Sequence, residues 1–368
     1  MRAVSSLIFS GFLFFSLIGR SQNVKIVIPA GTPEDKELTA IAAEPEAQKR
    51  IALYQDFVQK YSGNKAAAAY GNWQLSQQYL ATGDTAKALE CGSKALELYP
   101  NDLDIVLSQI GVAQAMQDGG KTVGFAVRGA EICHSIATQP KPADVSDADW
   151  NTQIADQQES ARSSCEYAET AAYNAIVAEQ DAAKRMNYIE EFTPAFPKSK
   201  FEDPVSQLAL YSLQQLNQPQ RVEAYGEKAL AANPDSVPTL LMLANAYSED
   251  PKQLAKAITH ANKVIALSGS STDSKQKMAA GVAHSTLGYT YLRQEKYTPA
   301  VAELKTAVAM LQDDPQAEQA ALFRLGYAYA KQNRRADSIA ALQKAAAIEG
   351  PYRAQARDML GKVSQAGK

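Results

Sequence analysis

The sequence predicts an all-α fold, an α-solenoid of helix–turn–helix repeats, and three observations favour it. The motif LGYTY at residues 287–291 recurs 38 residues later as LGYAY at residues 325–329. The stretch ECGSKAL at residues 90–96 matches AYGEKAL at residues 224–230, which indicates a duplicated block of roughly 134 residues. Apolar and small residues also recur at intervals of three and four, the period of an amphipathic helix. Such internal repetition is typical of arrays in which each unit packs mainly on its neighbours.

The first 21 residues predict a signal peptide. A basic start at Met1-Arg2 precedes an apolar run at residues 4–18, and small residues flank the expected cleavage point before Gln22. The run of about 15 residues is shorter than the ~20 that a permanent membrane-spanning helix requires. Arg20 occupies the place where a bacterial lipoprotein signal would have cysteine. We therefore expect a periplasmic or secreted protein without a stable membrane anchor after cleavage; an uncleaved anchor is the alternative.

Residues 22–44 predict an extended tether. Pro29, Gly31 and Pro33 interrupt this segment, and its start lacks helical periodicity.

The unit at residues 69–102 illustrates the predicted helix pair. Leu75 and Tyr79 lie on one face of the first helix, Gly83 marks the turn, and Ala88 and Ala95 lie on one face of the second. Small residues at the crossing allow two helices to approach closely, because larger ones would force the backbones apart at roughly 1–3 kcal/mol.

This pattern resembles the tetratricopeptide repeat, a 34-residue helix–turn–helix unit. Residues 281–314 match its signature with Leu287, Gly288, Tyr291, Tyr297, Ala300, Leu304 and Ala307. Residues 319–352 match with Leu322, Leu325, Gly326, Tyr329, Leu342 and Ala345, and residues 237–271 match with Leu243, Ala244 and Tyr247. Residues 203–236 and 104–137 match less completely, so the resemblance covers roughly residues 47–350. It implies a non-enzymatic scaffold that binds a protein or peptide in a concave groove.

The repeats divide the rest of the chain. We expect N-terminal repeat-like helices at residues 45–138, irregular connecting helices at residues 139–202, and C-terminal repeats at residues 203–368. Prolines at 140 and 142 begin the irregular part, and Ser146 with Asp149 predicts a capping box before long helices in residues 147–180. Residues 352–362 predict a terminal capping helix.

Composition excludes several functional classes. The chain has 37 basic and 40 acidic residues among 368, for a formal charge of −3. Removing residues 1–21 removes Arg2 and Arg20, which leaves 35 basic residues and a charge of −5. This balance disfavours a nucleic-acid partner, whose binding depends on neutralising phosphates.

The few cysteines and histidines form no reactive cluster in the sequence. His134, His260 and His284 fall in different repeat units without metal-ligand spacing, so we expect no metal and no cofactor. We favour the interpretation that Cys91, Cys133 and Cys165 are small buried core residues. The alternative, in an exported protein, is one disulfide, most simply Cys133–Cys165, which would leave Cys91 free.

Two glycine-containing stretches are expected to be ordinary turns. Residues 118–122 (DGGKT) lack the glycine that a phosphate-binding loop needs at position 115, where alanine stands, and residues 268–272 (SGSST) do not match a nucleophile elbow.

The resemblance also implies groove residues, which lie on the first helix of each unit. They are Tyr70, Trp73, Gln77, Asn245, Tyr289, Arg293, Phe323, Tyr327 and Lys331. For Trp73 and Phe323, packing into a neighbouring repeat is an equally good interpretation.

We predict an exported non-enzymatic scaffold that binds a protein or peptide at these groove residues. One alternative is a self-associating structural component of envelope assembly; another is a helical-repeat carbohydrate-active or carbohydrate-binding protein, which would need clustered carboxylates. The sequence leaves the oligomeric state open.

Overall fold

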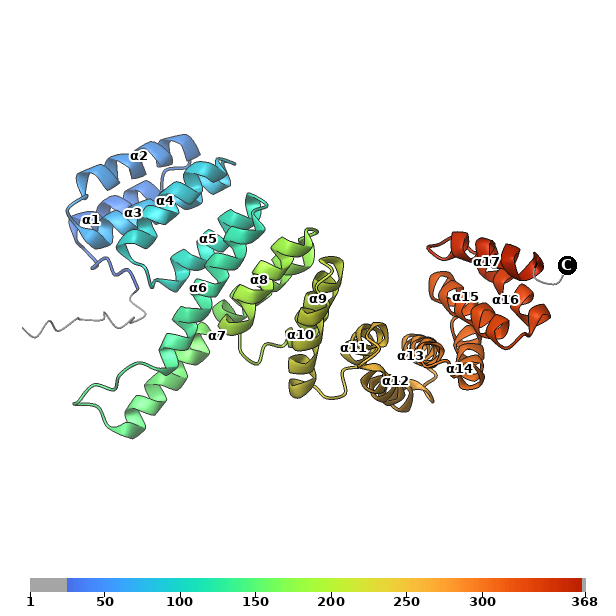
Figure 1. The fold of residues 1–368 in the computed structure, drawn as a ribbon. Coiled ribbons are helices and arrows are strands. Elements are labelled where there is room, and N and C mark those ends of the chain that lie inside the picture. The colour runs from blue at the N-terminus through green and yellow to red at the C-terminus, as the bar shows by residue number, and fades with distance from the viewer. Residues whose placement is uncertain (1–24, 366–368) are drawn as a thin grey trace, which may run out of the picture. The chain divides into compact units, whose positions relative to one another are not determined.

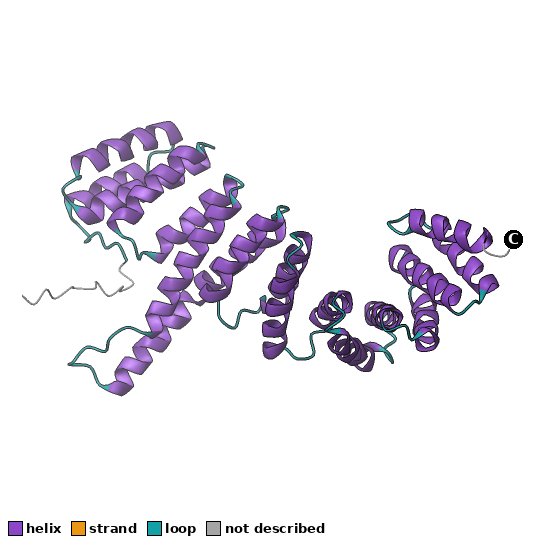
Figure 2. Ribbon diagram, viewed as in Figure 1, coloured by secondary structure: helices purple, strands orange, loops and turns teal. Residues whose placement is uncertain are grey.

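The computed structural model describes residues 25–365, so the predicted signal peptide lies outside the described residues. These residues form seventeen α-helices and no β-strand (Figures 1 and 2), which confirms the all-α fold. They divide into two compact units that meet at Ala175 and Ile176, inside the longest helix. No helix of the described part is long and apolar enough to cross a membrane.

The first unit contains six helices and most of a seventh. They are α1 (Pro33–Ala42), α2 (Ala47–Lys60), α3 (Lys65–Ala81), α4 (Thr85–Leu98), α5 (Leu103–Ala115), α6 (Gly119–Ala137) and α7 (Asp147–Ala178). The 32-residue α7 confirms the long helix expected after residue 146. Ser146 caps it, since its hydroxyl accepts from the amide of Asp149 at 3.1 Å.

The second unit begins with the end of α7 and contains the remaining helices. They are α8 (Ala182–Ala195), α9 (Glu202–Gln215), α10 (Pro219–Ala232), α11 (Val237–Glu249), α12 (Leu254–Ser268), α13 (Ser274–Arg293), α14 (Tyr297–Met310), α15 (Pro315–Lys331), α16 (Arg335–Ala347) and α17 (Arg353–Gln365). The last of these is the helix expected at residues 352–362.

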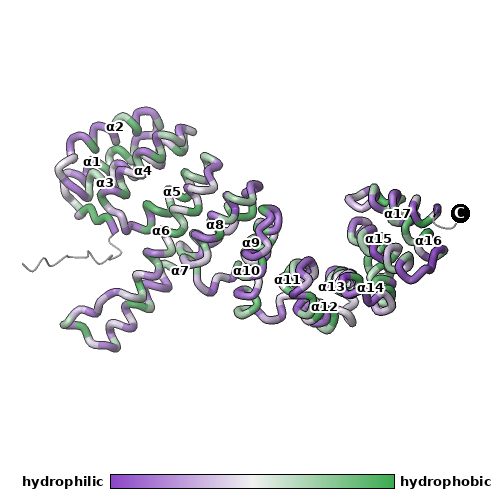
Figure 3. The backbone as a smooth tube through the Cα atoms, viewed as in Figure 1, coloured by the Kyte–Doolittle hydropathy of each residue, from purple (hydrophilic) through white to green (hydrophobic). Residues whose placement is uncertain are grey.

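The helices pack as pairs within each unit. Here the first helices of the pairs, α3, α5, α9, α11, α13 and α15, are called A-helices, and the helices that follow them are called B-helices. Each A-helix packs on its own B-helix. Among α9, α11, α13 and α15, each A-helix also contacts the next A-helix along the chain. Buried side chains form separate clusters along the chain, and hydrophobic residues are spread over all helices (Figure 3).

Turns within the pairs repeat one geometry. Gly83, Gln117, Asn217, Glu295 and Asn333 each have a positive φ of 52–84° and directly precede the N-cap of a B-helix. Four of these five residues are not glycine, so the turn does not require glycine. At Gly83 the positive φ carries no strain, because glycine lacks a Cβ. Residues 118–122 form the cap and first turn of α6, and residues 269–272 connect α12 to α13, as expected.

Small residues at the helix crossings have the role that the sequence predicts. A Cβ at Gly288 would lie 2.5 Å from Cγ of Leu304, and one at Gly326 would lie 2.6 Å from Cγ of Leu342. Both leucines are fully buried on the partner B-helix. Glycine on the A-helix thus admits leucine from the B-helix.

The duplicated block recurs in three dimensions. Arg50 on α2 donates to the carbonyl of Glu44 and to Gln78 on α3. Arg185 on α8 donates to the carbonyl of Glu179 and to Ser212 on α9. The two carbonyls both lie six residues upstream, so α2–α3 and α8–α9 share the same arginine clamp. The copies are offset by 135 residues at the arginines and by 134 at the acceptors on the next helix.

The glycines of the duplicated motif serve the same packing in both copies. A Cβ at Gly92 would overlap Gln109, and a Cβ at Gly226 would lie 2.7 Å from Leu243. Each glycine therefore makes room for the residue 17 positions later, on the next A-helix.

The extended tether expected at residues 22–44 is wrong for half of its described part. Residues 33–42 form helix α1, because Thr32 caps the amide of Asp35, Pro33 occupies the first turn and two acidic residues follow it. Leu38 and Ile41 are buried against α2. Residues 25–32 and 43–44 lie outside the helix. In the first of these stretches the amide of Ile26 donates to the carboxylate of Asp102 at 3.0 Å.

The preferred interpretation of the cysteines is also wrong. Cys133 on α6 and Cys165 on α7 form a disulfide, with their Cα atoms 6.1 Å apart. Cys91 is free and buried, as expected. Both paired cysteines pack against the core cluster that contains Ile132, Ile136 and Ala161.

Candidate functional site

We call the surface of the A-helices α9, α11, α13 and α15 the A-helix face of the second unit. It carries a polar and aromatic cluster around Tyr289. The hydroxyl of Tyr289 on α13 donates to the carboxylate of Glu249 on α11 at 3.1 Å. Arg293, one turn after Tyr289, donates to the same carboxylate at 3.3 Å and to the backbone carbonyl of Glu249 at 3.2 Å. The hydrogen bond with Tyr289 raises the pKa of Arg293. Three side chains from two A-helices therefore hold one another in place.

A third A-helix joins this cluster through Arg324. The guanidinium of Arg324 on α15 lies 4.5 Å from the ring centre of Tyr289, in cation–π geometry, and donates to the hydroxyl of Ser285 at 3.1 Å. Within residues 25–365, no carboxylate forms an ion pair with Arg324. We define the Tyr289 cluster as Glu249, Ser285, Tyr289, Arg293 and Arg324.

A pocket of about 270 Å³ adjoins the Tyr289 cluster. Glu249 belongs to the Tyr289 cluster and also lines this pocket. Asn245 and Met242 line the pocket from the same helix, α11. The end of α9 and the start of α10 supply the other wall, which is rich in carboxamides: Gln214, Asn217 and Gln218, with Pro219 and Val222. Carboxamides offer both donors and acceptors, which suits a ligand that also carries both, such as a peptide backbone.

The predicted groove residues of the second unit divide into two groups. Asn245, Tyr289 and Arg293 lie together at the pocket and the Tyr289 cluster. Phe323 instead stacks on Tyr352, with ring centres 5.3 Å apart, and so packs toward α17. Two further predicted residues, Tyr327 and the exposed Lys331, form a cation–π pair on α15 with the ammonium 5.5 Å from the ring centre.

The predicted groove residues of the first unit are engaged in packing. Trp73 packs against the core cluster that includes Leu96, Val106 and Ile132, and its indole nitrogen is buried. Tyr70 contacts Trp73 edge-to-face at 5.9 Å and packs on the preceding core cluster. Gln77 is half-buried on the same helix.

Three residues of this face are absent from the sequence-based set. Glu249 and Arg324 make the contacts described above, and Tyr211 on α9 is 50% exposed. Tyr211 and Tyr289 occupy the same place of their repeat units, the ninth, so the pattern itself could have identified Tyr211. Arg324 occupies the sixth place of its unit, which the groove pattern does not include.

The described residues hold no group of three His, Cys, Asp or Glu side chains arranged for a metal ion. The histidines lie apart on α6, α12 and α13. His284 contacts Glu303 at 2.6 Å, and His260 stacks on the buried Tyr247. Burial lowers the pKa of His260, and burial together with Glu227 raises the pKa of Tyr247.

Comparison with known proteins agrees with this architecture. Residues 320–350, most of α15 and all of α16, match the family model of the tetratricopeptide repeat. A comparison with curated proteins found no match.

Several solved structures are similar at low identity. They include YrrB, a TPR protein with an unusual peptide-binding site, at 16% identity and a TM-score of 0.38, over 64% of this chain and 97% of that one. The TPR domain of P58(IPK) is similar at 14% identity and a TM-score of 0.32, over 91% and 98%. Yeast Tom70 is similar at 12% identity and a TM-score of 0.32, over 87% and 96%. Likeness at this level does not extend to what the proteins bind. The chain is thus an all-helical repeat protein that carries a tetratricopeptide repeat at residues 320–350.

Proposed function

We propose that this chain is an exported, non-enzymatic scaffold that binds a protein or peptide through the A-helix face of its second unit. The observation that carries the proposal is the Tyr289 cluster, in which side chains from α11, α13 and α15 meet beside a carboxamide-lined pocket. Tyrosine and arginine are enriched among the residues that dominate binding energy at protein interfaces.

The side chains of the Tyr289 cluster are held in place and keep unused hydrogen-bond donors, and both properties support binding. Tyr289 and Arg293 are already held by Glu249, so little conformational entropy remains to be lost when a partner docks. Arg324 keeps guanidinium donors beyond the one that Ser285 uses. The neighbouring carboxamides can pair with the backbone of an extended segment, while Met242 and Val222 offer apolar contact.

Two features support the export part of the proposal. Residues 1–21 have the pattern of a cleavable signal peptide, and the chain contains a disulfide between Cys133 and Cys165. Disulfides persist in oxidising compartments and are rare in the cytosol. Intact mass measurement of the mature protein should therefore give a chain that begins at Gln22.

Site-specific photo-crosslinking tests the binding face. A benzophenone amino acid replaces Tyr211 or Tyr327 on the A-helix face, and Leu267 on the B-helix α12, 41% exposed, serves as the matched control. We expect discrete adducts from Tyr211 and Tyr327 and none from Leu267. Adducts only at Leu267, or none at all, would contradict the proposal. An adduct with a second copy of the chain would instead support self-association.

A further inference from the structure

We propose a second binding site, between helices α8, α9 and α10, for an apolar group that carries a carboxylate. The C-terminal residue of a peptide and a free aryl carboxylate share this chemistry. The site is separate from the A-helix face and does not depend on the function proposed for it.

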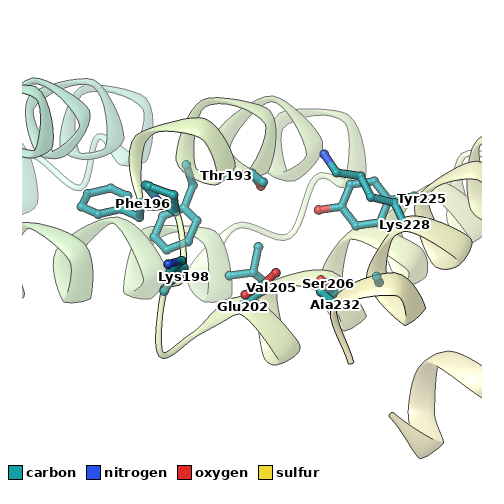
Figure 4. Close-up of a pocket in the computed structure, with 13 residues that line it drawn as sticks. Thr193, Phe196, Lys198, Glu202, Val205, Ser206, Tyr225, Lys228 and Ala232 are labelled. Atoms are coloured by element: carbon teal, nitrogen blue, oxygen red, sulfur yellow. The ribbon is translucent and has the colours of Figure 1, made fainter. Parts of the chain in front are cut away.

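The site is a pocket of about 140 Å³ with an apolar floor (Figure 4). Phe192 and Phe196 on and after α8 lie 4.8 Å apart between ring centres, and Val205 on α9 is buried beside them. Ala229 and Ala232 close the floor from α10. The volume is well below the ~300 Å³ of sites for drug-sized ligands, so it suits one side-chain-sized group.

Hydroxyl groups form one wall of the pocket. Thr193, Ser206 and Tyr225 line this wall, and the hydroxyl of Thr193 donates to the carbonyl of Ile189 at 2.8 Å. Burial raises the pKa of Tyr225, so its hydroxyl stays neutral. This wall is therefore polar but uncharged.

The rim carries charges that lack partners. Lys198, Glu202 and Lys228 line the pocket, and none of them forms an ion pair with another described residue. The first copy of the duplicated block shows which partner Lys228 lacks. There the residue equivalent to Lys228 is Lys94, which pairs with Glu90 at 2.7 Å, whereas alanine stands at the corresponding position 224.

The same comparison shows why the pocket is open. Position 98 of the first copy is leucine, and its equivalent on α10 is Ala232. Position 58 is valine packed against the first core cluster, and its equivalent is the polar Thr193. At these two positions the second copy has lost apolar volume, and Thr193 adds a hydroxyl group to a pocket that an unpaired lysine lines.

These features together specify the ligand. The aromatic and aliphatic floor favours an apolar group, since burying one contributes about 1.5–3 kcal/mol. Two lysines outnumber the single Glu202 on the rim, so a carboxylate placed toward Lys228 is attracted, while an ammonium has only Glu202 to meet. A neutral apolar group would fill the floor but leave Lys228 without a counter-charge.

Binding of defined probes tests the proposal. The probes are a fluorescein-labelled hexapeptide Gly-Ser-Gly-Ser-Ala-Phe with a free C-terminus, its C-terminally amidated form, and unlabelled 3-phenylpropionate as competitor. With the full mature chain, fluorescence anisotropy should show the free acid binding about two- to fivefold more tightly than the amide. Competition by 3-phenylpropionate at a similar concentration assigns the site to small aryl carboxylates, whereas resistance to it assigns the site to peptide termini.

Three variants and one control sharpen the test. Ala232→Leu restores the residue of the first copy, so this variant should fold normally. Because leucine fills the pocket, the variant should bind the free-acid peptide about tenfold or more weakly. Lys228→Gln should remove the preference for acid over amide, and Glu202→Gln should increase it. Lys94→Gln, at the equivalent paired lysine, should change nothing. Circular dichroism confirms that each variant is folded.

Several outcomes would overturn the inference. They are equal binding of acid and amide, unchanged binding by folded Ala232→Leu, or no saturable binding of the acid up to about 5 mM. Crosslinking from Tyr211 and Tyr327 should be unaffected by Ala232→Leu, so failure here leaves the A-helix face proposal to its own test.

Discussion

Loss of the Cys133–Cys165 disulfide should destabilise the first unit by about 3–4 kcal/mol. The two cysteines are 32 residues apart in sequence, and cross-linking a loop of this length lowers the entropy of the unfolded chain by an amount worth about 3.7 kcal/mol at 25 °C. The perturbation is the double variant Cys133→Ser/Cys165→Ser, or reduction of the wild-type protein.

Tryptophan fluorescence isolates the effect. The chain has two tryptophans, Trp73 and Trp150, and both lie in the first unit. Trp73 packs in the cluster that contains Ile132 and Ile136, beside the disulfide. Guanidinium unfolding followed by tryptophan emission should therefore show a lower midpoint for the double variant. Reductant should shift the wild type to the same midpoint and leave the double variant unchanged.

Two results would refute this reasoning. One is an unchanged midpoint after confirmed reduction of the disulfide. The other is a thiol count of three in the unreduced, denatured protein, where the structure predicts one, from Cys91. A count of three would also remove the disulfide as support for export.

Further predictions concern packing, protonation and the arginine clamp. Gly288→Ala should destabilise by about 1 kcal/mol, because crowding of Leu304 outweighs the gain in helix propensity, whereas Gly124→Ala, which meets open space, should stabilise by about 0.5–1 kcal/mol in thermal melts. Burial lowers the pKa of His260 below 6.5, so the unfolded chain takes up a proton that the folded chain resists. Stability should fall as pH drops below 6.5 and level off below the folded pKa, and His260→Gln should remove this limb of a pH-dependent melting curve. Arg185→Met should cost about 2–3 kcal/mol by circular dichroism, since it leaves the carbonyl of Glu179 without its donor.

The repeat pattern predicted the helix pairs because each pair depends on residues close in sequence. Gly288 and Leu304 are 16 residues apart and meet within one unit, so a fixed spacing carries the packing. Helix α1 was missed because Pro33 was taken as a helix breaker, although proline is well tolerated in the first turn.

The candidate site depends on contacts between units of the repeat, which a single sequence does not encode directly. Tyr289 and Arg293 were predicted from their places in the repeat, but their contact with Glu249 spans 40 residues or more. Trp73 was predicted in the same way, from the fifth place of its unit, but neighbouring side chains bury its indole instead. A side chain at a predicted groove place can thus be buried by packing instead, depending on the residues of the next pair.

Hydrogen exchange with a captured partner tests the central claim most directly. After crosslinking identifies the partner, amide exchange of the full mature chain is compared with and without it. The account predicts increased protection in α11, α13 and α15, and loss of this protection in the double variant Tyr289→Ala/Arg324→Ala. Protection confined to the B-helices α12, α14 and α16, or unchanged by the double variant, would contradict it.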